Sequence, residues 1–419
     1  MDQLSKNLFT PIGITNFRNQ ERRFGIKQAD RSSHMYIIGK TGTGKSTLIK
    51  NMAIDDIRSD RGLALIDPHG DLAGDILHFI PNQRMKDVIY FNPADTEHPI
   101  AFNPLERTDP AFRHLVASGL ISVFKKIWPE FWGPRLEHIL RYSVLTLLEY
   151  RGSTLLDIPK LLTNKKFRAG AVKLLKNQQL KDFWLLEFDK YSAWRRSEAI
   201  SPILNKVGQF LSNPPLRNVV SQPESAFNLR EVMDQGKILI VDLSKGKIGE
   251  DNCSLLGSLL VTKLWLAAMS RAELPEEKRE PFHLYVDEAH NFITLSFADV
   301  LSESRKYGLN LILAHQYIEQ FEEKIRAAIF GNVGTMISFR LGVNDAKVLA
   351  EEFHPVFSQN DLVSLPNYHI YLKLAVDGKT SQAFSGCSLP PLVDYKTQGN
   401  KDEVIRLSKT NFSTKKERT

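Results

Sequence analysis

The chain has 419 residues and a formal net charge of +7; 42% of its residues are hydrophobic and 25% are charged. This composition excludes a fibrous or disordered chain, predicts about two or three globular domains, and permits contact with nucleic acid without requiring it. The two cysteines form no metal-binding or redox motif, which favours a reducing, cytoplasmic location. Neither a signal peptide nor an apolar run of about 18 residues is evident, so we expect no direct membrane insertion.

The first 34 residues are polar with scattered apolar positions. Residues 11–14 and 23–26 favour two short strands joined by a charged turn at residues 19–22. Such a hairpin could pair along the edge of a sheet or could cover a nucleotide base. We prefer the edge hairpin.

A phosphate-binding loop follows the apolar strand at residues 35–38. Residues 39–46 have the spacing G-x-x-x-x-G-K-S. Glycines let successive backbone N–H groups point at phosphate oxygens, and a helix that starts near Lys45 directs its positive end at the same oxygens. Lys45 adds a full charge, and the Ser46 hydroxyl is a ligand for Mg²⁺. The sequence therefore predicts an ATP site formed by Gly39, Thr41, Gly42, Thr43, Gly44, Lys45, Ser46 and Thr47.

Strand patterns alternate with helical patterns after this loop. The apolar runs lie at residues 62–66, 88–91, 237–243, 282–286, 309–314 and 335–340. This alternation predicts an α/β fold with a mainly parallel sheet and helices on both faces. In such sheets, ligands bind beyond the carboxyl ends of the strands.

Three polar residues, Asp67, His69 and Asp71, follow the strand at residues 62–66. They could position Mg²⁺ or water at the ligand-binding edge. They could equally form a turn with a capping aspartate. The sequence leaves both interpretations open.

The region 105–227 has helical periodicity and no strand signal, which predicts an all-helical insertion. It contains four tryptophans and several basic pairs. Tryptophan together with lysine or arginine could hold single-stranded nucleic acid. The stronger interpretation is that the apolar stripes form the core and that the basic pairs are solvated. The residues concerned are Trp128, Trp132, Trp184, Trp194, Lys125, Lys126, Lys165, Lys166, Arg195 and Arg196.

A second group of functional residues follows the strand at residues 282–286. Asp287 and Glu288 come directly after it, in a Walker B arrangement. We expect Asp287 to hold Mg²⁺ through its water shell, and Glu288 to accept a proton from the attacking water or to orient it. Gln316 follows the strand at residues 309–314 and would sense the γ-phosphate or the lytic water, although it could also be a surface turn residue.

These patterns divide the chain into five parts. Residues 1–34 form the strand or flap segment, 35–104 the first part of the motor domain, and 105–227 the helical insertion. Residues 228–393 form the second part of the motor domain, with a hairpin signal at Asp377, Gly378 and Lys379. Residues 394–419 are expected to be a mobile polar tail.

Taken in order, the motifs resemble the HerA/FtsK superfamily of hexameric DNA-pumping ATPases, and in particular the conjugative coupling proteins of the TraD/TraG type. The resemblance covers roughly residues 10–390. It rests on GKTGTGKS (39–46), IDPHGDL (66–72), WGPRLEHILR (132–141), YVDEAH (285–290), SRKYGLNLILAHQ (304–316) and the strand that carries Arg340.

The resemblance implies a RecA-like P-loop NTPase with an inserted all-helical domain, assembled as a homo-hexameric ring around DNA. Nucleotide would lie between adjacent subunits, and an arginine of the neighbour would stabilise charge on the transferred phosphoryl group. By its position, Arg305 is similar to that arginine finger, and Arg340 is a second candidate. Either could instead form a surface salt bridge.

Two features of related proteins are not found ahead of the loop: the membrane helices of coupling proteins and the β-barrel of HerA proteins. The docking device is then missing or supplied by another chain. The leading hypothesis is an ATP-driven DNA translocase, whose protein partner could be a nuclease, an effector or a secretion channel. The alternatives are the ATPase subunit of a defence or repair complex that drives a nuclease or effector, and an ATP-dependent assembly scaffold with little translocation.

Overall fold

The computed structural model describes residues 8–16, 21–106, 109–392 and 400–414. The chain divides into two compact units. Unit 1 comprises Met1–Phe91, Arg230–Asp242 and Ala267–Ser408. Unit 2 comprises Asn92–Leu229, Leu243–Leu266 and Lys409–Thr419.

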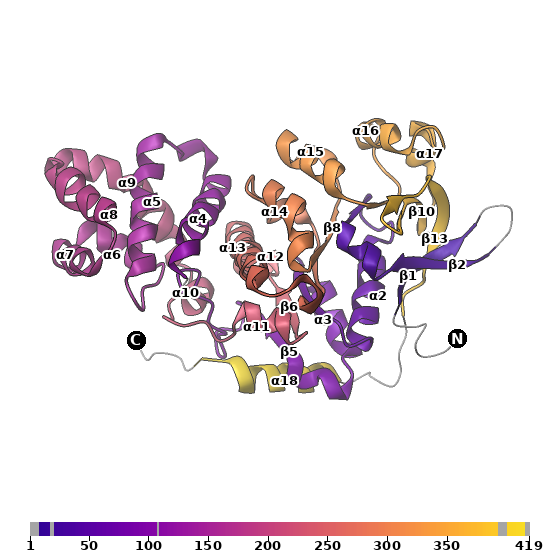
Figure 1. Cartoon of the computed structure of the whole chain (residues 1–419), viewed down its shortest axis with the longest axis horizontal. Helices are drawn as coiled ribbons and strands as arrows, with labels where there is room; N and C mark the ends of the chain where they lie inside the picture. The colour runs from indigo at the N-terminus through magenta and orange to yellow at the C-terminus, as the bar shows by residue number, and fades with distance from the viewer. Residues whose placement is uncertain (1–7, 17–20, 107–108, 393–399, 415–419) are drawn as a thin grey trace. The chain divides into compact units, whose positions relative to one another are not determined.

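Unit 1 is built on one mixed sheet whose strand order is β2-β1-β13-β10-β9-β3-β8-β7-β4-β6-β5. The strands from β9 to β5 are parallel, and β10, β13, β1 and β2 continue the sheet in antiparallel pairs. Figure 1 shows the amino-terminal hairpin beside the carboxy-terminal strands β10 and β13. The bounds are β1 (Phe9–Thr15), β2 (Arg23–Lys27), β3 (Met35–Ile38), β4 (Gly62–Asp67), β5 (Val88–Phe91), β6 (Ile238–Asp242), β7 (Phe282–Val286), β8 (Leu309–His315), β9 (Thr335–Ser338), β10 (His369–Lys373) and β13 (Phe384–Ser388).

The central strands are buried on both faces, which explains why β3, β4 and β8 are nearly continuous apolar runs. One face packs against helices α2 (Lys45–Arg58) and α3 (Asp71–Ile76). On the other face, the ring of Tyr36 meets Phe330 edge-on, with 5.8 Å between the ring centroids. The predicted α/β fold with a mainly parallel sheet and helices on both faces is therefore confirmed.

The amino-terminal strands form the predicted edge hairpin. β1 pairs antiparallel with both β2 and β13, so the hairpin extends the sheet. Part of the predicted turn, residues 19–20, lies outside the described residues. The second predicted hairpin is also present: β11 (Ala375–Val376) pairs with β12 (Lys379–Thr380) across Asp377 and Gly378, both at positive φ.

The regular elements of unit 2 are helices, as predicted for the insertion, apart from an isolated bridge between Ile100 and Ser413 in the part of the chain that the structure describes. The unit is larger than residues 105–227. It begins at Asn92 and also includes Leu243–Leu266, because most of α13 (Glu250–Met269) packs with it. The predicted apolar stripes are core residues: Ile139, Val144, Ile203 and Val207 are all buried. The other helices of this unit are α4 (Arg113–Ile127), α5 (Pro134–Glu149), α6 (Asp157–Thr163), α7 (Lys165–Leu174), α8 (Gln178–Asp182), α9 (Ala193–Leu211), α10 (Pro214–Val220) and α12 (Lys245–Ile248).

The expectation of a mobile polar tail is wrong for Asn400–Phe412, which form helix α18. Val404 of α18 is fully buried in the core of unit 1. The Ser408 hydroxyl accepts a 2.8 Å hydrogen bond from the backbone N–H of Tyr90 on β5, the last strand of the sheet. The helix thus satisfies a donor on an exposed sheet edge. Its few apolar residues are outnumbered by polar ones, which hid the helical pattern in the sequence.

One helical stretch, Glu250–Glu273, is long and apolar enough to cross a membrane by length and composition, with a mean hydropathy of 1.5. The sequence shows this stretch as several shorter apolar runs, because charged residues interrupt it. Of the 18-residue window that passes this test, 56% is buried in the protein, and core helices of soluble proteins pass the same test. It is therefore weak evidence for a membrane span.

Candidate active site

The phosphate-binding loop lies between β3 and α2, at the carboxyl edge of the parallel strands. Gly42 and Gly44 have φ values of +74° and +122°, which residues with a Cβ rarely adopt. The buried ammonium of Lys45 donates to the backbone oxygens of Gly39 at 2.5 Å and Lys40 at 3.2 Å. The backbone oxygens of the loop therefore bind the ammonium of Lys45.

Two glycines of the loop also allow close packing. A Cβ at Gly39 would lie 2.5 Å from Cβ of Phe339. A Cβ at Gly44 would lie 2.9 Å from Cδ1 of Tyr368 and 3.0 Å from Cε1 of Phe339. Phe339, which follows β9, and Tyr368, which precedes β10, therefore pack against the loop.

The two acidic residues lie at the end of β7, where the sequence pattern predicts them. Both Asp287 and Glu288 are buried, with 5% of each residue exposed. Glu288 has left-handed backbone angles, φ +46° and ψ +52°, and its carbonyl accepts a 2.9 Å hydrogen bond from the Asn291 amide. A non-glycine residue in this conformation is strained, and such strain concentrates at functional sites.

Gln316 connects the loop to Glu288. Its amide N–H donates to Glu288 Oε1 at 2.6 Å, and its amide oxygen accepts from the Thr41 hydroxyl at 2.9 Å. The orientation of the amide follows from the carboxylate, which can only accept when ionised. Strand β8 lies between β3 and β7 in the sheet, so Gln316 emerges between the two motifs. The structure therefore brings Thr41, Lys45, Glu288 and Gln316 together.

Electrostatic interactions confirm this proximity. Burial lowers the pKa of Lys45, and the charges of Glu288 and Asp287 oppose that shift. The pKa of Asp287 is raised to about 7, chiefly by burial and also by the neighbouring charges of Glu288 and Asp67, while the charge of Lys45 opposes the shift. The site thus concentrates carboxylates around a single lysine, which suits it to receive a cation.

Asp67 acts as a turn and cap residue. Its carboxylate accepts from the backbone N–H groups of His69 at 2.8 Å and Ala73 at 2.9 Å. This geometry supports the capping interpretation. One observation still supports the interpretation of Asp67 as a metal-site residue: its charge contributes to the raised pKa of Asp287. His69 and Asp71 are exposed.

The two candidate arginine fingers lie in different places. Arg305 is exposed on the 3₁₀ turn Ser304–Tyr307, which precedes β8, so it lies at the amino edge of the strands, away from its own loop. Arg340 is close to its own loop. Its guanidinium donates to Asn367 Oδ1 at 2.9 Å and to the Leu365 oxygen at 3.3 Å, and its backbone oxygen accepts from the Lys40 N–H. Arg340 therefore braces the loop of its own chain.

The similarities to known proteins agree with this geometry. The sequence profile of the family described as "Type IV secretion-system coupling protein DNA-binding domain" matches residues 24–374. The chain belongs to this family. The predicted resemblance to conjugative coupling proteins is confirmed. Among curated protein sequences, none matches this chain.

Solved structures of coupling proteins share the fold. The unbound monoclinic form of the bacterial conjugative coupling protein TrwBΔN70 is similar with a TM-score of 0.64 and 17% identity, over 93% of this chain and 91% of that one. TrwB in complex with ADP and Mg²⁺ has a TM-score of 0.64 and 17% identity, over 90% of each chain. VirB4 of Thermoanaerobacter pseudethanolicus has a TM-score of 0.58 and 14% identity, over 92% of this chain and 97% of that one. At these identities the likeness shows the fold alone.

The tryptophans of this coupling-protein domain differ in exposure. Trp184 is fully buried and donates to the Thr146 hydroxyl at 2.8 Å, and Trp128 stacks on Phe124. Trp194 has 75% of its surface exposed and precedes Arg195 on α9. The core interpretation therefore holds for Trp184 and Trp128, and Trp194 remains available for contact with nucleic acid.

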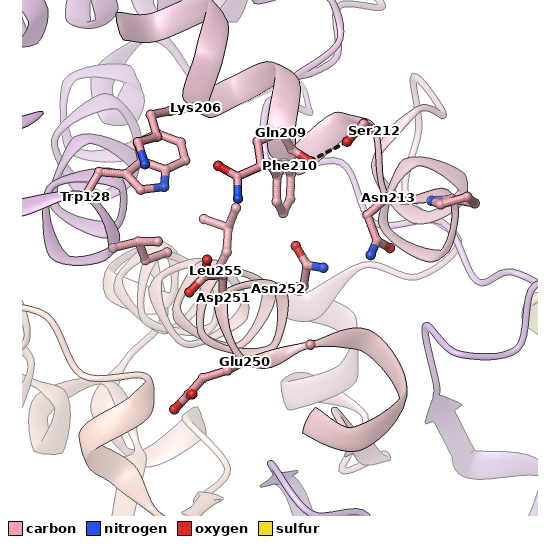
Figure 2. A pocket seen from close by; sticks show the side chains of 13 residues that line it. Trp128, Lys206, Gln209, Phe210, Ser212, Asn213, Glu250, Asp251, Asn252 and Leu255 are labelled. Atoms are coloured by element: carbon pink, nitrogen blue, oxygen red, sulfur yellow. Dashed lines mark hydrogen bonds between the residues drawn. The ribbon is translucent and has the colours of Figure 1, made fainter.

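A pocket of about 560 Å³ lies in unit 2. The end of α4, the second half of α9 and the first turns of α13 enclose it, and Figure 2 shows Trp128, Lys206 and Gln209 among its lining side chains. No residue argued above for nucleotide binding lines it. The pocket is therefore not part of the candidate active site.

Sequence reasoning missed two kinds of neighbour. Phe339 and Tyr368 contact the loop from segments about 300 residues away, and no local pattern announces such a contact. His290 of the YVDEAH motif has Nδ1 3.5 Å from Glu288 Oε2, a contact that the sequence analysis does not predict. Its place three residues after Asp287 was the available signal.

The raised pKa of Asp287 makes stability depend on pH. The unfolded chain ionises Asp287 near 3.8, whereas the folded chain keeps the proton until about pH 7. Between these values the folded state binds more protons, so its stability falls as pH rises, and the loss is complete above about pH 7. We expect metal-free Asp287→Asn to melt at a higher temperature than the unaltered chain at pH 8, with the difference vanishing near pH 4. Calorimetry in EDTA checks this. An equal difference at both pH values would contradict the shift.

Proposed function

We propose that this chain is an ATP-hydrolysing motor that transports DNA as a ring of six identical subunits. The observation that carries the proposal is the hydrogen-bonded series from Thr41 through Gln316 to Glu288, with Lys45 beside it. It joins a phosphate-binding loop to a buried carboxylate, as hydrolysis of a terminal phosphate requires. Membership of the coupling-protein family supports DNA as the transported substrate.

Nucleotide binding follows from the loop. Backbone N–H groups of residues 39–46 and the Lys45 ammonium would bind the β- and γ-phosphates of ATP. Ser46 at the start of α2 and the buried Asp287 supply oxygen ligands that suit Mg²⁺, and phosphate oxygens and water would complete its shell. Mg²⁺, when bound, neutralises phosphate charge. One solved structure of TrwB is a complex with ADP and Mg²⁺, and another is a complex with a non-hydrolysable ATP analogue, which supports both assignments.

Hydrolysis follows from Glu288 and Gln316. Glu288 would accept the proton of the attacking water as general base. Gln316, held between Thr41 and Glu288, would orient that water and report the presence of the γ-phosphate. Because one amide contacts both motifs, a change at the phosphate displaces a group bonded to the base.

In a ring, the neighbouring subunit would supply the arginine finger of each nucleotide site. Arg305 is exposed and lies at the other edge of the sheet from its own loop, which supports a role at a neighbour's nucleotide. Arg340 is engaged within its own chain and fits a finger less well.

DNA would stimulate ATP hydrolysis through contacts between the protein and the DNA phosphates, and such contacts weaken as the salt concentration rises.

We also propose a cytoplasmic position beside a secretion channel. The family description names a secretion system, which supports channel proteins as partners. A defence or repair motor and an assembly scaffold remain hypotheses. The family match favours transport over both, since it names a secretion system.

Two substitutions separate binding from hydrolysis. We expect Lys45→Ala to lose ATP binding, and Glu288→Gln to bind ATP while its hydrolysis falls by at least about 100-fold. Phosphate release and ATP titration measure the two quantities. Lys50→Ala, on the same helix with Lys50 paired to Asp75, and Glu403→Gln, on the surface of α18, are matched controls that should leave both unchanged. Normal hydrolysis by either site variant would refute the proposed function.

Mixed rings test the arginine finger. We expect Arg305→Ala alone and Lys45→Ala alone to be inactive. A mixture should recover part of the ATPase activity, because a Lys45→Ala subunit still offers Arg305 to the intact loop of its neighbour. Arg340→Ala mixed with Lys45→Ala should not recover activity in this way, since Arg340 serves its own chain. Full activity of Arg305→Ala, or no recovery in rings shown to be mixed, would exclude the finger.

A further inference from the structure

Tyr368 contacts the phosphate-binding loop from outside the motifs discussed above. Its backbone N–H donates to the Thr43 oxygen at 2.8 Å. Its ring lies against Gly44, where a Cβ would be only 2.9 Å from Cδ1 of the tyrosine. One edge of the ring therefore touches the loop that would carry the phosphates.

The backbone of Tyr368 is held in an unusual conformation. Its φ is +66°, in the left-handed region that bulky residues rarely adopt. The Ser388 N–H donates to its carbonyl at 2.8 Å, and the Arg340 guanidinium anchors the preceding Asn367. Strain that the surroundings maintain in this way concentrates at ligand-binding sites.

The ring is also open to solvent. Tyr368 has 46% of its surface exposed, whereas Phe339, the other ring against Gly44, is fully buried. Phe339 therefore acts as support for the loop. Tyr368 has ring surface left over, and an aromatic face stacks with any nucleobase.

The strand order indicates which end of the nucleotide faces Tyr368. Glu288 and Gln316 follow β7 and β8 on one side of β3, so the γ-phosphate points to that side. Tyr368 precedes β10, on the opposite side of β3 beyond β9. The nucleoside end of a triphosphate on this loop is thereby directed toward the tyrosine.

We propose that the Tyr368 ring stacks on the nucleobase of the bound nucleotide and so provides affinity that the phosphates alone do not. This inference rests on the proposed function, because it requires a nucleotide on the loop. It adds a base-binding residue to a site otherwise made of phosphate-binding and catalytic groups. It also gives the bracing by Arg340 a purpose, since the brace fixes the segment that carries the ring.

Binding of two ligands tests the proposal. Calorimetric titration with Mg²⁺ and the non-hydrolysable analogue AMPPNP measures base and phosphates together, and inorganic tripolyphosphate measures phosphates alone. We expect Tyr368→Ala to bind AMPPNP about 10-fold more weakly, with tripolyphosphate unchanged. Tyr368→Phe keeps the ring and should bind both ligands as the unaltered chain does.

Tyr317 is a matched control. It is 44% exposed and follows Gln316 on the other side of β3. Tyr317→Ala should leave the affinity for AMPPNP unchanged. The proposal is overturned if Tyr368→Ala binds AMPPNP normally, or if it weakens both ligands equally, which would show that the ring only supports the loop. Failure of the unaltered chain to bind either ligand would instead contradict the nucleotide site itself.

Discussion

The amide of Gln316 is the contact on which the site depends. It accepts from a hydroxyl of the phosphate-binding loop and donates to the carboxylate of Glu288, so two motifs almost 250 residues apart share one side chain. An amide suits this position because it offers a donor and an acceptor at fixed separation without adding charge. A carboxylate there would face Glu288 as a like charge. The neutral link thus adds no further negative charge to a region where burial and neighbouring carboxylates raise the pKa of Asp287 to about 7.

The parallel sheet makes this contact possible. Since β3, β8, β7 and β4 are neighbours and run the same way, the residues that follow them meet at one edge. The loop, Gln316, the acidic pair and the Asp67 turn are all such residues. β9 and the antiparallel strand β10 serve the same edge, because Phe339 follows β9, Tyr368 precedes β10, and both lie against the loop. β3, β4, β7, β8, β9 and β10 therefore place the side chains of the candidate site along one edge of the sheet.

Local signals in the sequence predicted the elements that this edge requires. β3, α2, β5 and β7 have the bounds that the apolar runs and the loop spacing indicated, and Lys45, Glu288 and Gln316 lie together as expected. These features could be predicted because each couples a short pattern to the end of a strand. The catalytic and ligand-binding roles of these three residues stay predictions, as do those of Arg305 and Ser46, since they concern a nucleotide, a neighbouring subunit and a metal ion.

The features that sequence reasoning missed depend on distant segments. The boundaries of unit 2 differ from the predicted insertion at 105–227, because α13 packs with helices more than 100 residues earlier in the chain. Helix α18 was missed because its stability comes from burying Val404 in a core built elsewhere, while its own composition is polar. The contact of Tyr368 with Gly44 joins residues 324 positions apart and has no periodic signature.

One measurement tests the central claim most directly: a cryo-electron microscopy map of the chain with AMPPNP, Mg²⁺ and DNA. We expect the triphosphate on residues 39–46, with Lys45 Nζ turned from the Gly39 oxygen to the phosphates and Gln316 between the γ-phosphate and Glu288. A map with the nucleotide bound elsewhere, or with Glu288 facing away from the γ-phosphate, would contradict the central claim.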